Sequence, residues 1–334
     1  MSQIATATGL SVSTVSRALS GRGDLPVETR IRVTEAAHRL GYRRGDTERG
    51  RPTRTDPRMI ELVLGMFDDG WTNEVAAGAR AGAQALGYDL VLTLERDDPA
   101  DDWPQRVAAR RSSGVVLGLI RPSATQLAIL SGLNIPLVLL DPRAEPGSRL
   151  ASIGTTDRDG GWEVGRHLAQ LGHRRFLLVA GEPHLRFGRA REEGFMAAVA
   201  EFAPDGEVTT VKGNWQDDDL TAVIAPVMAR SRPTAVFACN DAMAAGTYRA
   251  ARRLGLSIPR DLSVVGFDDA SRYAGLVPAL TTIRQPIRRM ATRAVELVHE
   301  LRRGTLTSLE RIEVPTTLIE RDSTAAPSSH SDAA

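Results

Sequence analysis

A twelve-residue segment near the N-terminus, GLSVSTVSRALS, carries the residues that point most clearly to a chemistry. Gly9 can form a tight turn between two helices because it has no Cβ, and Ser11 can cap the second helix through its hydroxyl. Val15 and Leu19 then share one apolar face, while Arg17 lies on the opposite, polar face. This arrangement is typical of a helix-turn-helix that enters the major groove of DNA. The alternative is an ordinary helical hairpin inside a core.

The charge of the chain supports the DNA-binding interpretation. Residues 1–58 hold eleven arginines and six acidic residues, a net charge of +5, whereas the whole chain carries +1 and the remainder therefore −4. A basic segment on a mildly acidic body suits phosphate contact at one end only, although a solvated surface would also be basic. Residues 43–58 are rich in arginine, glycine and proline and contain no aliphatic residue. They are predicted to form a linker or arm, able to lie along phosphates or in a minor groove.

The residues that precede this arm are predicted to complete a small domain over 1–42. Pro26 can sit in the first turn of a third helix, where its missing N–H costs nothing. An apolar stripe follows at helical spacing, made by Val33, Ala36, Ala37 and Leu40. Gly41 is expected to end that helix. Three short helices would then share a small core and leave the second helix exposed.

From Met59 onward, apolar runs alternate with amphipathic helical stretches. The expected strands are Met59–Met66, Tyr88–Thr93, Gly114–Leu119, Pro136–Leu140, Arg175–Ala180, Ala235–Cys239 and Leu262–Phe267. Expected helices include Asn73–Leu86, Gly160–Leu171, Ala190–Val199, Leu220–Ala229, Met243–Leu254 and Ile287–Arg302. Buried strands separated by helices indicate parallel sheets covered on both faces, and the length suits two of them. The fold class is therefore α/β: a helix-turn-helix head and a two-subdomain, doubly wound core over residues 59–322.

Composition excludes several classes of protein. Cys239 is the single cysteine, so neither a disulfide framework nor a cysteine metal cluster can form. No secretory signal or membrane-spanning run is visible, which predicts a cytoplasmic protein without membrane contact. The turn Gly65–Gly70 lacks the glycine spacing of a dinucleotide site, and the six histidines show no metal spacing. No enzyme activity, cofactor or metal is predicted.

Seven segments, spread over nearly the whole chain, resemble the LacI/GalR family of transcriptional regulators, and they occur in the same order as in that family. The segments are Gly9–Ser20, Thr29–Arg30 through Leu40–Tyr42, Leu171–Arg174, Arg191–Phe195, Cys239–Asp241, Ser263–Asp269 and Leu280–Pro286. The resemblance implies a homodimeric repressor of double-stranded operator DNA. It also implies a core like that of periplasmic sugar-binding proteins, in which a small effector, a sugar or a related molecule, controls the affinity for operator. His173, within Leu171–Arg174, is expected to be structural.

The resemblance also assigns the residues that contact DNA. Val12, Ser13 and Arg17 match base-reading positions, and Arg17 can donate two hydrogen bonds to a guanine edge. Ser11, Thr14 and Ser16 suit phosphates. The alternative for Arg17 is a phosphate contact or a surface salt bridge.

Two departures from the family pattern stand out. The residues ahead of the first helix are few, so either this helix is short and weakly capped or, as we expect, the natural start codon lies upstream of Met1. In the linker, Arg51 stands where the family places a leucine that wedges into the minor groove. We expect Arg51 to contact DNA by charge instead, and we expect the operator centre to be kinked less.

The effector site is expected where polar residues follow the strands of the core. The resemblance and the chemistry of sugars select Asp69, Trp71, Arg191, Trp215, Asn240, Asp268 and Gln285. Carboxylates, amides and arginine can bind sugar hydroxyls, and a tryptophan ring can cover the apolar face. For the two tryptophans the alternative is plain packing. For Asp241 and Asp269, capping of the helices that follow them is as good an expectation as a ligand contact.

The resemblance further divides the core. An N-terminal subdomain is expected over about 59–155 and 286–310, and a C-terminal one over about 156–285 and 311–322. The tail Ser323–Ala334 is small and polar, and is expected to be disordered. The rival function is a sugar-binding transport protein without a regulatory role, which would have a secretory signal and no DNA-binding head.

Overall fold

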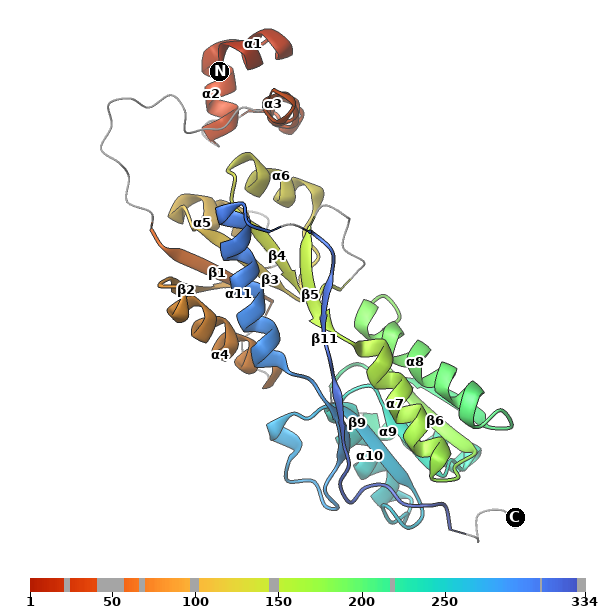
Figure 1. Ribbon diagram of the computed structural model, residues 1–334. Helices are drawn as coiled ribbons and strands as arrows, with labels where there is room; N and C mark the ends of the chain where they lie inside the picture. Colours follow the sequence, from red (N-terminus) through yellow and green to blue (C-terminus); the bar gives the residue numbers. More distant parts are fainter. Residues whose placement is uncertain are drawn as a thin grey trace.

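The computed structural model describes residues 1–20, 25–40, 57–65, 70–96, 102–143, 150–216, 220–306 and 308–328. They form a small helical head and an elongated core of two sheets, with the head at one end and the second sheet at the other (Figure 1). The linker residues 41–56, including Arg51, and the loop residue Asp69 lie outside the described residues.

The head contains three helices, α1 (Ser2–Thr8), α2 (Val12–Ser20) and α3 (Val27–Arg39). Gly9 ends α1 with a φ of 65°, the left-handed conformation that the turn prediction requires. Val15 and Leu19 are buried against the apolar face of α3, as expected. Leu40, however, is 46% exposed and does not complete the predicted stripe, because α3 ends at Arg39.

The first sheet has the strand order β11-β5-β4-β3-β1-β2, and its paired strands are parallel. Its strands are β1 (Met59–Leu64), β2 (Asp89–Leu94), β3 (Gly114–Gly118), β4 (Leu137–Leu140), β5 (Ala151–Thr155) and β11 (Ile312–Val314). On one face lie α4 (Gly70–Ala85) and α11 (Ile287–Arg303), and on the other α5 (Trp103–Arg110) and α6 (Ala124–Gly132). Each face therefore has its own hydrophobic core.

The second sheet has the order β12-β10-β9-β8-β6-β7, and only β12 runs antiparallel to its neighbour. Its strands are β6 (Arg175–Ala180), β7 (Glu207–Lys212), β8 (Ala235–Ala238), β9 (Ser263–Asp268), β10 (Thr281–Arg284) and β12 (Thr317–Ile319). The helices α7 (Asp157–Gln170), α8 (Arg186–Phe202), α9 (Leu220–Ser231) and α10 (Asp241–Arg253) cover it, with a short 3-10 turn at Ser271–Tyr273.

Every strand and helix expected from the sequence is present, with ends shifted by a few residues. Strands β5, β7, β10, β11 and β12 were not expected, nor were α5 and α6. The strand β7 is an edge strand whose residues are mostly exposed or half-buried, and β5 contains Ser152 and Gly154. Neither segment has the continuous apolar run that identifies a buried strand.

The subdomain boundary predicted after residue 310 is wrong. Strand β11 pairs with β5 in the first sheet, with Ile312 opposite Ile153 and Val314 opposite Thr155. The chain changes sheet only between Val314 and Thr317, where β12 begins. A three-residue strand that completes a sheet edge has too few residues to show a sequence pattern.

The expectation of disorder from Ser323 onward is also wrong for residues 323–328. Ser323 is fully buried, and its hydroxyl donates to the carbonyl of Val264 while accepting from the backbone N–H of Thr281. The backbone N–H of Ala325 donates to the hydroxyl of Ser263. These bonds hold the segment across the second sheet, although its composition resembles that of a free tail. Residues 329–334 lie outside the described part of the chain.

His173 is buried beneath this C-terminal segment. Its Nε2 lies 3.0 Å from the carbonyl oxygen of Ala325 and 3.0 Å from the hydroxyl of Ser263, and its Nδ1 lies 3.0 Å from the hydroxyl of Thr234. The carbonyl can only accept, so the Nε2 that faces it carries a proton. Burial lowers the pKa of His173 to about 4. His173 is structural, as expected.

The lowered pKa predicts a pH dependence of stability. The unfolded chain takes up the proton near pH 6.5 and the folded chain only near pH 4, so stability is fully present above about pH 6.5 and falls as the pH drops toward about 4. Denaturant unfolding of wild type and of His173→Gln, which can donate but does not titrate, measures this effect. We expect the wild-type slope to be steeper by about 1 kcal/mol per pH unit between pH 6 and 4.5. Equal slopes would exclude the assigned role.

Helices α7 and α8 pack so closely that glycine is required at their crossing. A Cβ on Gly194 would lie 1.9 Å from the carbonyl oxygen of Arg158, and one on Gly161 would lie 2.0 Å from that of Arg191. Neither clash can be relieved by turning a side chain, because both partners are backbone atoms. Gly194→Ala should therefore lower the free energy of unfolding by about 1–3 kcal/mol.

Denaturant unfolding of Gly194→Ala beside Gly275→Ala checks this expectation. Gly275 has an ordinary backbone conformation and open space around its Cβ position, so its substitution should change stability by less than about 0.5 kcal/mol. Similar values for the two variants would contradict the close crossing.

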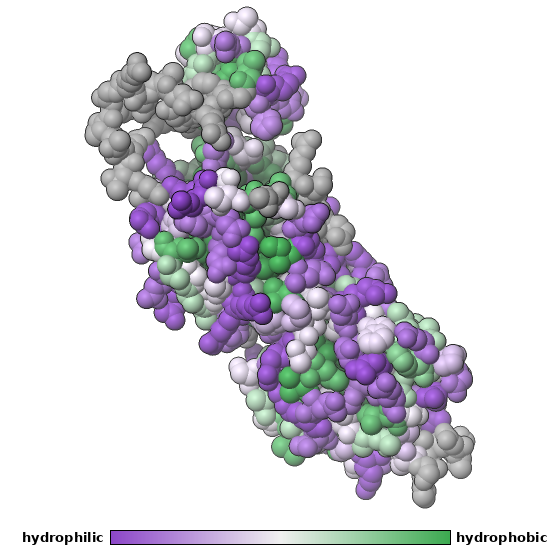
Figure 2. Space-filling view, in the orientation of Figure 1, coloured by the Kyte–Doolittle hydropathy of each residue, from purple (hydrophilic) through white to green (hydrophobic). Residues whose placement is uncertain are grey.

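The surface is mostly hydrophilic on the face shown in Figure 2, with apolar side chains in small groups. Among the described residues, no helix combines the length and apolar character needed to cross a bilayer.

Candidate functional site

The carboxyl ends of strands from both sheets meet at the junction of the two halves of the core. Thr155 ends β5 of the first sheet, and Asp268 ends β9 of the second. Asn240 lies two residues after the end of β8, and Gln285 follows β10 directly. Loops at the carboxyl ends of parallel strands are where open α/β sheets bind ligands.

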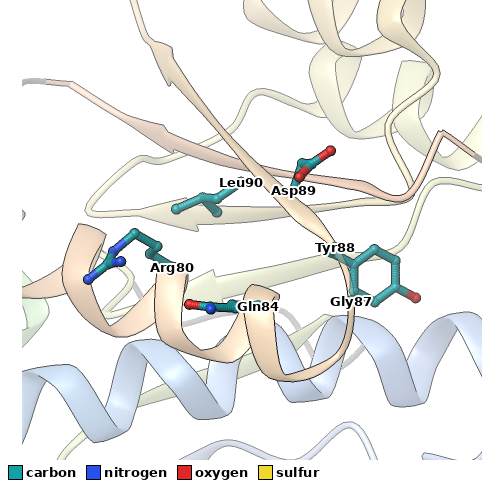
Figure 3. Close-up of a pocket in the computed structure, with 6 residues that line it drawn as sticks. All are labelled: Arg80, Gln84, Gly87, Tyr88, Asp89 and Leu90. Carbon is teal, nitrogen blue, oxygen red and sulfur yellow. The ribbon is translucent and has the colours of Figure 1, made fainter.

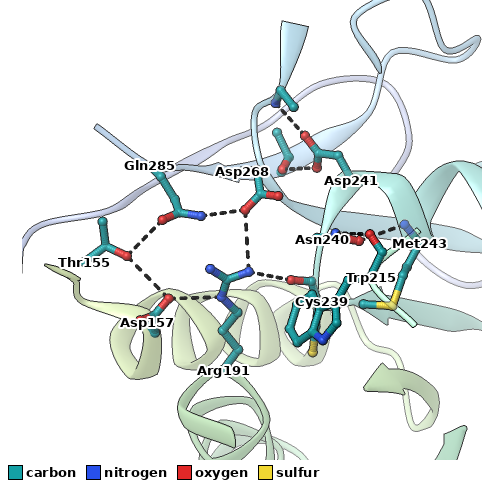
Figure 4. Close-up of polar contacts among 12 residues, drawn as sticks. Thr155, Asp157, Arg191, Trp215, Cys239, Asn240, Asp241, Met243, Asp268 and Gln285 are labelled. Carbon is teal, nitrogen blue, oxygen red and sulfur yellow. Dashed lines mark hydrogen bonds and ion pairs between the residues drawn. The ribbon is translucent and has the colours of Figure 1, made fainter. Parts of the chain in front are cut away.

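Arg191 is the centre of this junction. It projects from α8, is only 3% exposed, and reaches three acceptors (Figure 4). Its Nε donates to Asp157 at 3.0 Å, and one terminal nitrogen donates to the carbonyl of Cys239 at 2.7 Å. The same nitrogen lies 3.5 Å from Asp268. The guanidinium thus bridges the start of α7 and the ends of β8 and β9.

Gln285 closes a ring of polar contacts through this arginine. Its amide nitrogen donates to Asp268 at 2.5 Å, and its amide oxygen accepts from the hydroxyl of Thr155 at 3.0 Å. The Thr155 hydroxyl is also 3.4 Å from Asp157, which returns to Arg191. The ring joins the first sheet at Thr155 to the second sheet at Asp268, so a change at its members can alter the relation of the two halves.

The guanidinium of Arg191 keeps its charge in spite of its burial. Burial alone would lower the pKa of Arg191, but the nearby carboxylates of Asp157 and Asp268 raise it above the ordinary value. The guanidinium carbon lies 3.7 Å from the centre of the Phe267 ring, which favours the cation further. A fixed cation beside carboxylate and amide groups can bind a ligand that offers several hydroxyls.

Trp215 lies next to this ring of contacts. Its φ is 67°, in the left-handed region, and its indole packs where a Cβ on Gly181 or Gly188 would collide with it. The amide of Asn240 donates to the carbonyl of Trp215 at 3.0 Å, while its oxygen accepts from the N–H of Met243 and caps α10. The indole Nε1 is buried without a hydrogen-bond partner.

The backbone at the strand ends is strained. Asp141, which follows β4, has a φ of 47°, and Asp268 has a φ of 117°. Non-glycine residues rarely adopt such angles, and strain of this kind gathers at binding sites. One carboxylate oxygen of Asp141 is buried without a hydrogen-bond partner. Burial and the nearby Asp157 raise the pKa of Asp141, against the opposing effect of three arginines.

The polar face of α2 in the head is open to solvent. Ser11 caps the helix by accepting from the N–H of Thr14 at 3.1 Å, and its hydroxyl lies 2.8 Å from those of Ser13 and Thr14. Val12 is 49% exposed and Arg17 is exposed, while Ser16 is half-buried. A helix of this shape and polarity can present these side chains to base edges and phosphates.

Comparison with known proteins identifies the family. Residues 1–45 match the family described as "Bacterial regulatory proteins, lacI family", and residues 166–324 match the "Periplasmic binding protein-like domain". An HTH-type transcriptional regulator of Streptomyces limosus is 34% identical, over 97% of this chain and 94% of its own length. The chain belongs to the LacI family. The repressor PurR of Erwinia tasmaniensis is 28% identical over 96% of each chain.

Solved structures agree with this assignment at the level of the fold. A CelR regulator in complex with cellobiose superposes with a TM-score of 0.72 at 24% identity, covering 96% of this chain and 98% of the other. A Lac repressor dimer bound to operator and an anti-inducer superposes with a TM-score of 0.70 at 24% identity, covering 97% and 98%. The chain is thus a LacI-family DNA-binding regulator with a periplasmic-binding-type core, and the rival interpretation as a transport protein is set aside.

The structure brings together most of the residues expected to bind the effector of this LacI-family protein. Arg191, Asp268 and Gln285 share one hydrogen-bonded ring, and Asn240 with Trp215 lies beside it. Trp71 is half-buried in the first turn of α4, where it packs against the core of the first sheet. The assignment of all these residues to an effector remains a prediction.

Four polar residues at the junction are not expected from the sequence: Thr155, Asp157, Arg186 and Asp141. Asp157 is 1% exposed and accepts from both Arg191 and Arg186. Asp141 directly follows an apolar run, which is the signal that selected Asn240 and Asp268, and it could have been found in the same way.

Capping, one of the two roles that the sequence leaves open for Asp241 and Asp269, is not observed for either residue. Asn240 caps α10, one residue earlier than predicted. Asp241 instead accepts from the N–H of Ala270 at 2.8 Å and from the hydroxyl of Thr282 at 2.6 Å. Asp269 pairs with Arg284 and Arg321, each at 2.6 Å. Both carboxylates therefore fix the loop that follows β9.

Proposed function

We propose that this protein is a homodimeric transcriptional repressor that binds a near-palindromic operator, and that a sugar bound at the ring around Arg191 controls its affinity. Operator binding would place its action in the cytoplasm. The observation that carries the proposal is the coexistence, in one chain, of the exposed α2 face with Arg17 and the buried polar ring at the sheet junction.

The DNA-binding part of the proposal rests on α2. Arg17, Val12 and Ser13 are proposed to contact base edges, and Ser11, Thr14 and Ser16 to contact the phosphate backbone. A dimer would read one half-site with each α2. The structure of Lac repressor bound to operator is a dimer, and PurR is a repressor, so both assignments follow the relatives. Arg51 remains a proposed contact of the linker.

The effector part of the proposal rests on the chemistry of the ring. Asp268 and Gln285 offer acceptors to hydroxyls, and Arg191 offers donors. The Arg191 contact to Asp268, at 3.5 Å, is the longest in the ring and is the one a ligand hydroxyl would most easily replace. Trp215, Trp71, Asn240 and Asp69 are proposed to line the same site. The fold relative CelR binds cellobiose.

Two linked experiments test the proposal. In vitro selection with the full-length protein should enrich a near-palindromic duplex. Thermal-shift measurement with cellobiose, ribose, sugar phosphates and purine bases should then identify the effector class, because a ligand at 100 times its Kd stabilises the native state by about 2.7 kcal/mol. A gel shift on the selected duplex completes the test.

The outcomes of these experiments test the DNA-binding function and the class of effector separately. A neutral sugar that raises the Tm and changes the gel shift supports the proposal. Failure to enrich any sequence would overturn the regulatory function. Stabilisation by purine bases alone would overturn the sugar assignment while leaving the DNA-binding function in place.

A further inference from the structure

Arg58, the last residue of the predicted linker, is held to the core by several contacts. Arg58 is exposed, but its Nε donates to the carbonyl of Gly87 at 2.7 Å and its terminal nitrogen to the carbonyl of Leu86 at 3.2 Å. Its own carbonyl accepts from the N–H of Asp89 at 2.8 Å. Its guanidinium carbon lies 5.7 Å from the centre of the Tyr88 ring. We call these contacts the Arg58 clamp.

The residues around the Arg58 clamp leave space for the guanidinium and support the Tyr88 ring beside it. Gly87 has a φ of 71°, and a Cβ there would lie 2.7 Å from the guanidinium of Arg58. The Tyr88 hydroxyl lies 2.9 Å from Nδ1 of His299, so α11 supports the ring against which Arg58 lies. Figure 3 shows Tyr88 and Gly87 where α4 turns into β2, beside a shallow cavity of about 440 Å³ that is also lined by Arg80 and Gln84.

The clamp lies at the far end of two helices that begin at the effector site. Helix α4 starts next to Trp71 and ends just before Leu86, and α11 starts two residues after Gln285 and carries His299 near its end. The two helices touch without intervening side chains, since a Cβ on Gly78 would lie 2.3 Å from the carbonyl oxygen of Arg288. Glu74 and Arg288 also form an ion pair between them. The linker therefore enters the core at the start of β1, beside the turn between α4 and β2, and α4 is packed closely against α11.

We propose that Arg58 is a positioning residue that fixes where the linker leaves the core and thereby sets the half-site spacing of the DNA that the dimer accepts. This inference rests on the proposed function. One inserted base pair moves two half-sites apart by about 3.4 Å and rotates them around the helix axis, so a fixed exit point on each subunit would favour one spacing over its neighbours.

The test measures affinity for duplexes that carry the selected half-sites at their selected spacing and with one or two base pairs inserted or removed. Wild type should bind the selected spacing at least about tenfold more tightly than the worst one. Arg58→Ala should reduce that preference to less than about threefold. Arg58→Lys keeps the charge but cannot form the forked contact, so it should behave like Arg58→Ala.

Arg80→Ala is the matched control, because it removes an exposed arginine of α4 that the clamp does not include. It should keep the wild-type spacing preference. Hydrogen exchange of the Asp89 amide, which accelerates when the clamp is released, shows directly that Arg58→Ala has opened it.

The inference is overturned by any of three results. The first is that the wild type binds all half-site spacings with similar affinity. The second is that Arg58→Ala accelerates hydrogen exchange of the Asp89 amide but leaves the spacing preference unchanged. The third is that Arg58→Lys keeps the wild-type spacing preference. Failure of the wild type to select any DNA would instead remove the proposed function itself.

Discussion

Replacing Arg191 by methionine should lower the free energy of unfolding of the core by about 3–5 kcal/mol. Methionine fills a similar volume but leaves Asp157, which is 1% exposed, without its main cation, and leaves the carbonyl of Cys239 without a donor. Asp157 then keeps only Arg186, whose terminal nitrogen lies 3.3 Å from it, and removing one partner of a buried ion pair is strongly destabilising. Denaturant unfolding at neutral pH measures the loss.

Arg252→Met provides the control, since Arg252 is exposed on α10 and its loss should change stability by less than about 0.5 kcal/mol. The effector function of the ring is better tested by Asp268→Asn, which retains an oxygen that can accept from Gln285. That variant should fold and bind operator, yet bind the effector more weakly by about 1–3 kcal/mol. A stable Arg191→Met protein would show that the ring does not hold Asp157 as described.

Some residues of this site could be predicted from the sequence, but the contacts between them could not. Arg191, Asp268 and Gln285 could be found because they lie in motifs of the LacI family. From the sequence, Arg191 is expected to act only on a ligand. Its pairing with Asp157 joins positions 34 residues apart through a close helix crossing, and no local pattern predicts such a contact.

In the fold, too, only features encoded by a local sequence pattern could be predicted. Elements with long apolar or amphipathic patterns, such as α11 and β6, were predicted because their own residues encode the pattern. Strand β11 and the segment from Ser323 were not, because their order comes from partners elsewhere, β5 in one case and Ser263 and Val264 in the other. Polar, short segments are ordered by tertiary hydrogen bonds that composition does not reveal.

The second large effect is expected in DNA recognition. Arg17→Ala should cost about 1–3 kcal/mol at one base pair of each half-site and should relax the preference for that base. The reason is geometric: Arg17 is exposed on α2, and a guanidinium can donate two parallel hydrogen bonds to a guanine edge. Binding to a library of half-site variants measures both the affinity and the preference.

Arg32→Ala separates base reading from general electrostatics, because Arg32 is an exposed arginine on α3 and not on α2. Its loss should weaken binding to all sequences alike and reduce the dependence of log K on log salt by at most about one unit. If Arg17→Ala shows this same uniform loss, then Arg17 contacts a phosphate. Base reading would in that case have to rest on Val12 and Ser13, whose short side chains lie in the first turn of α2 and reach less far into the groove.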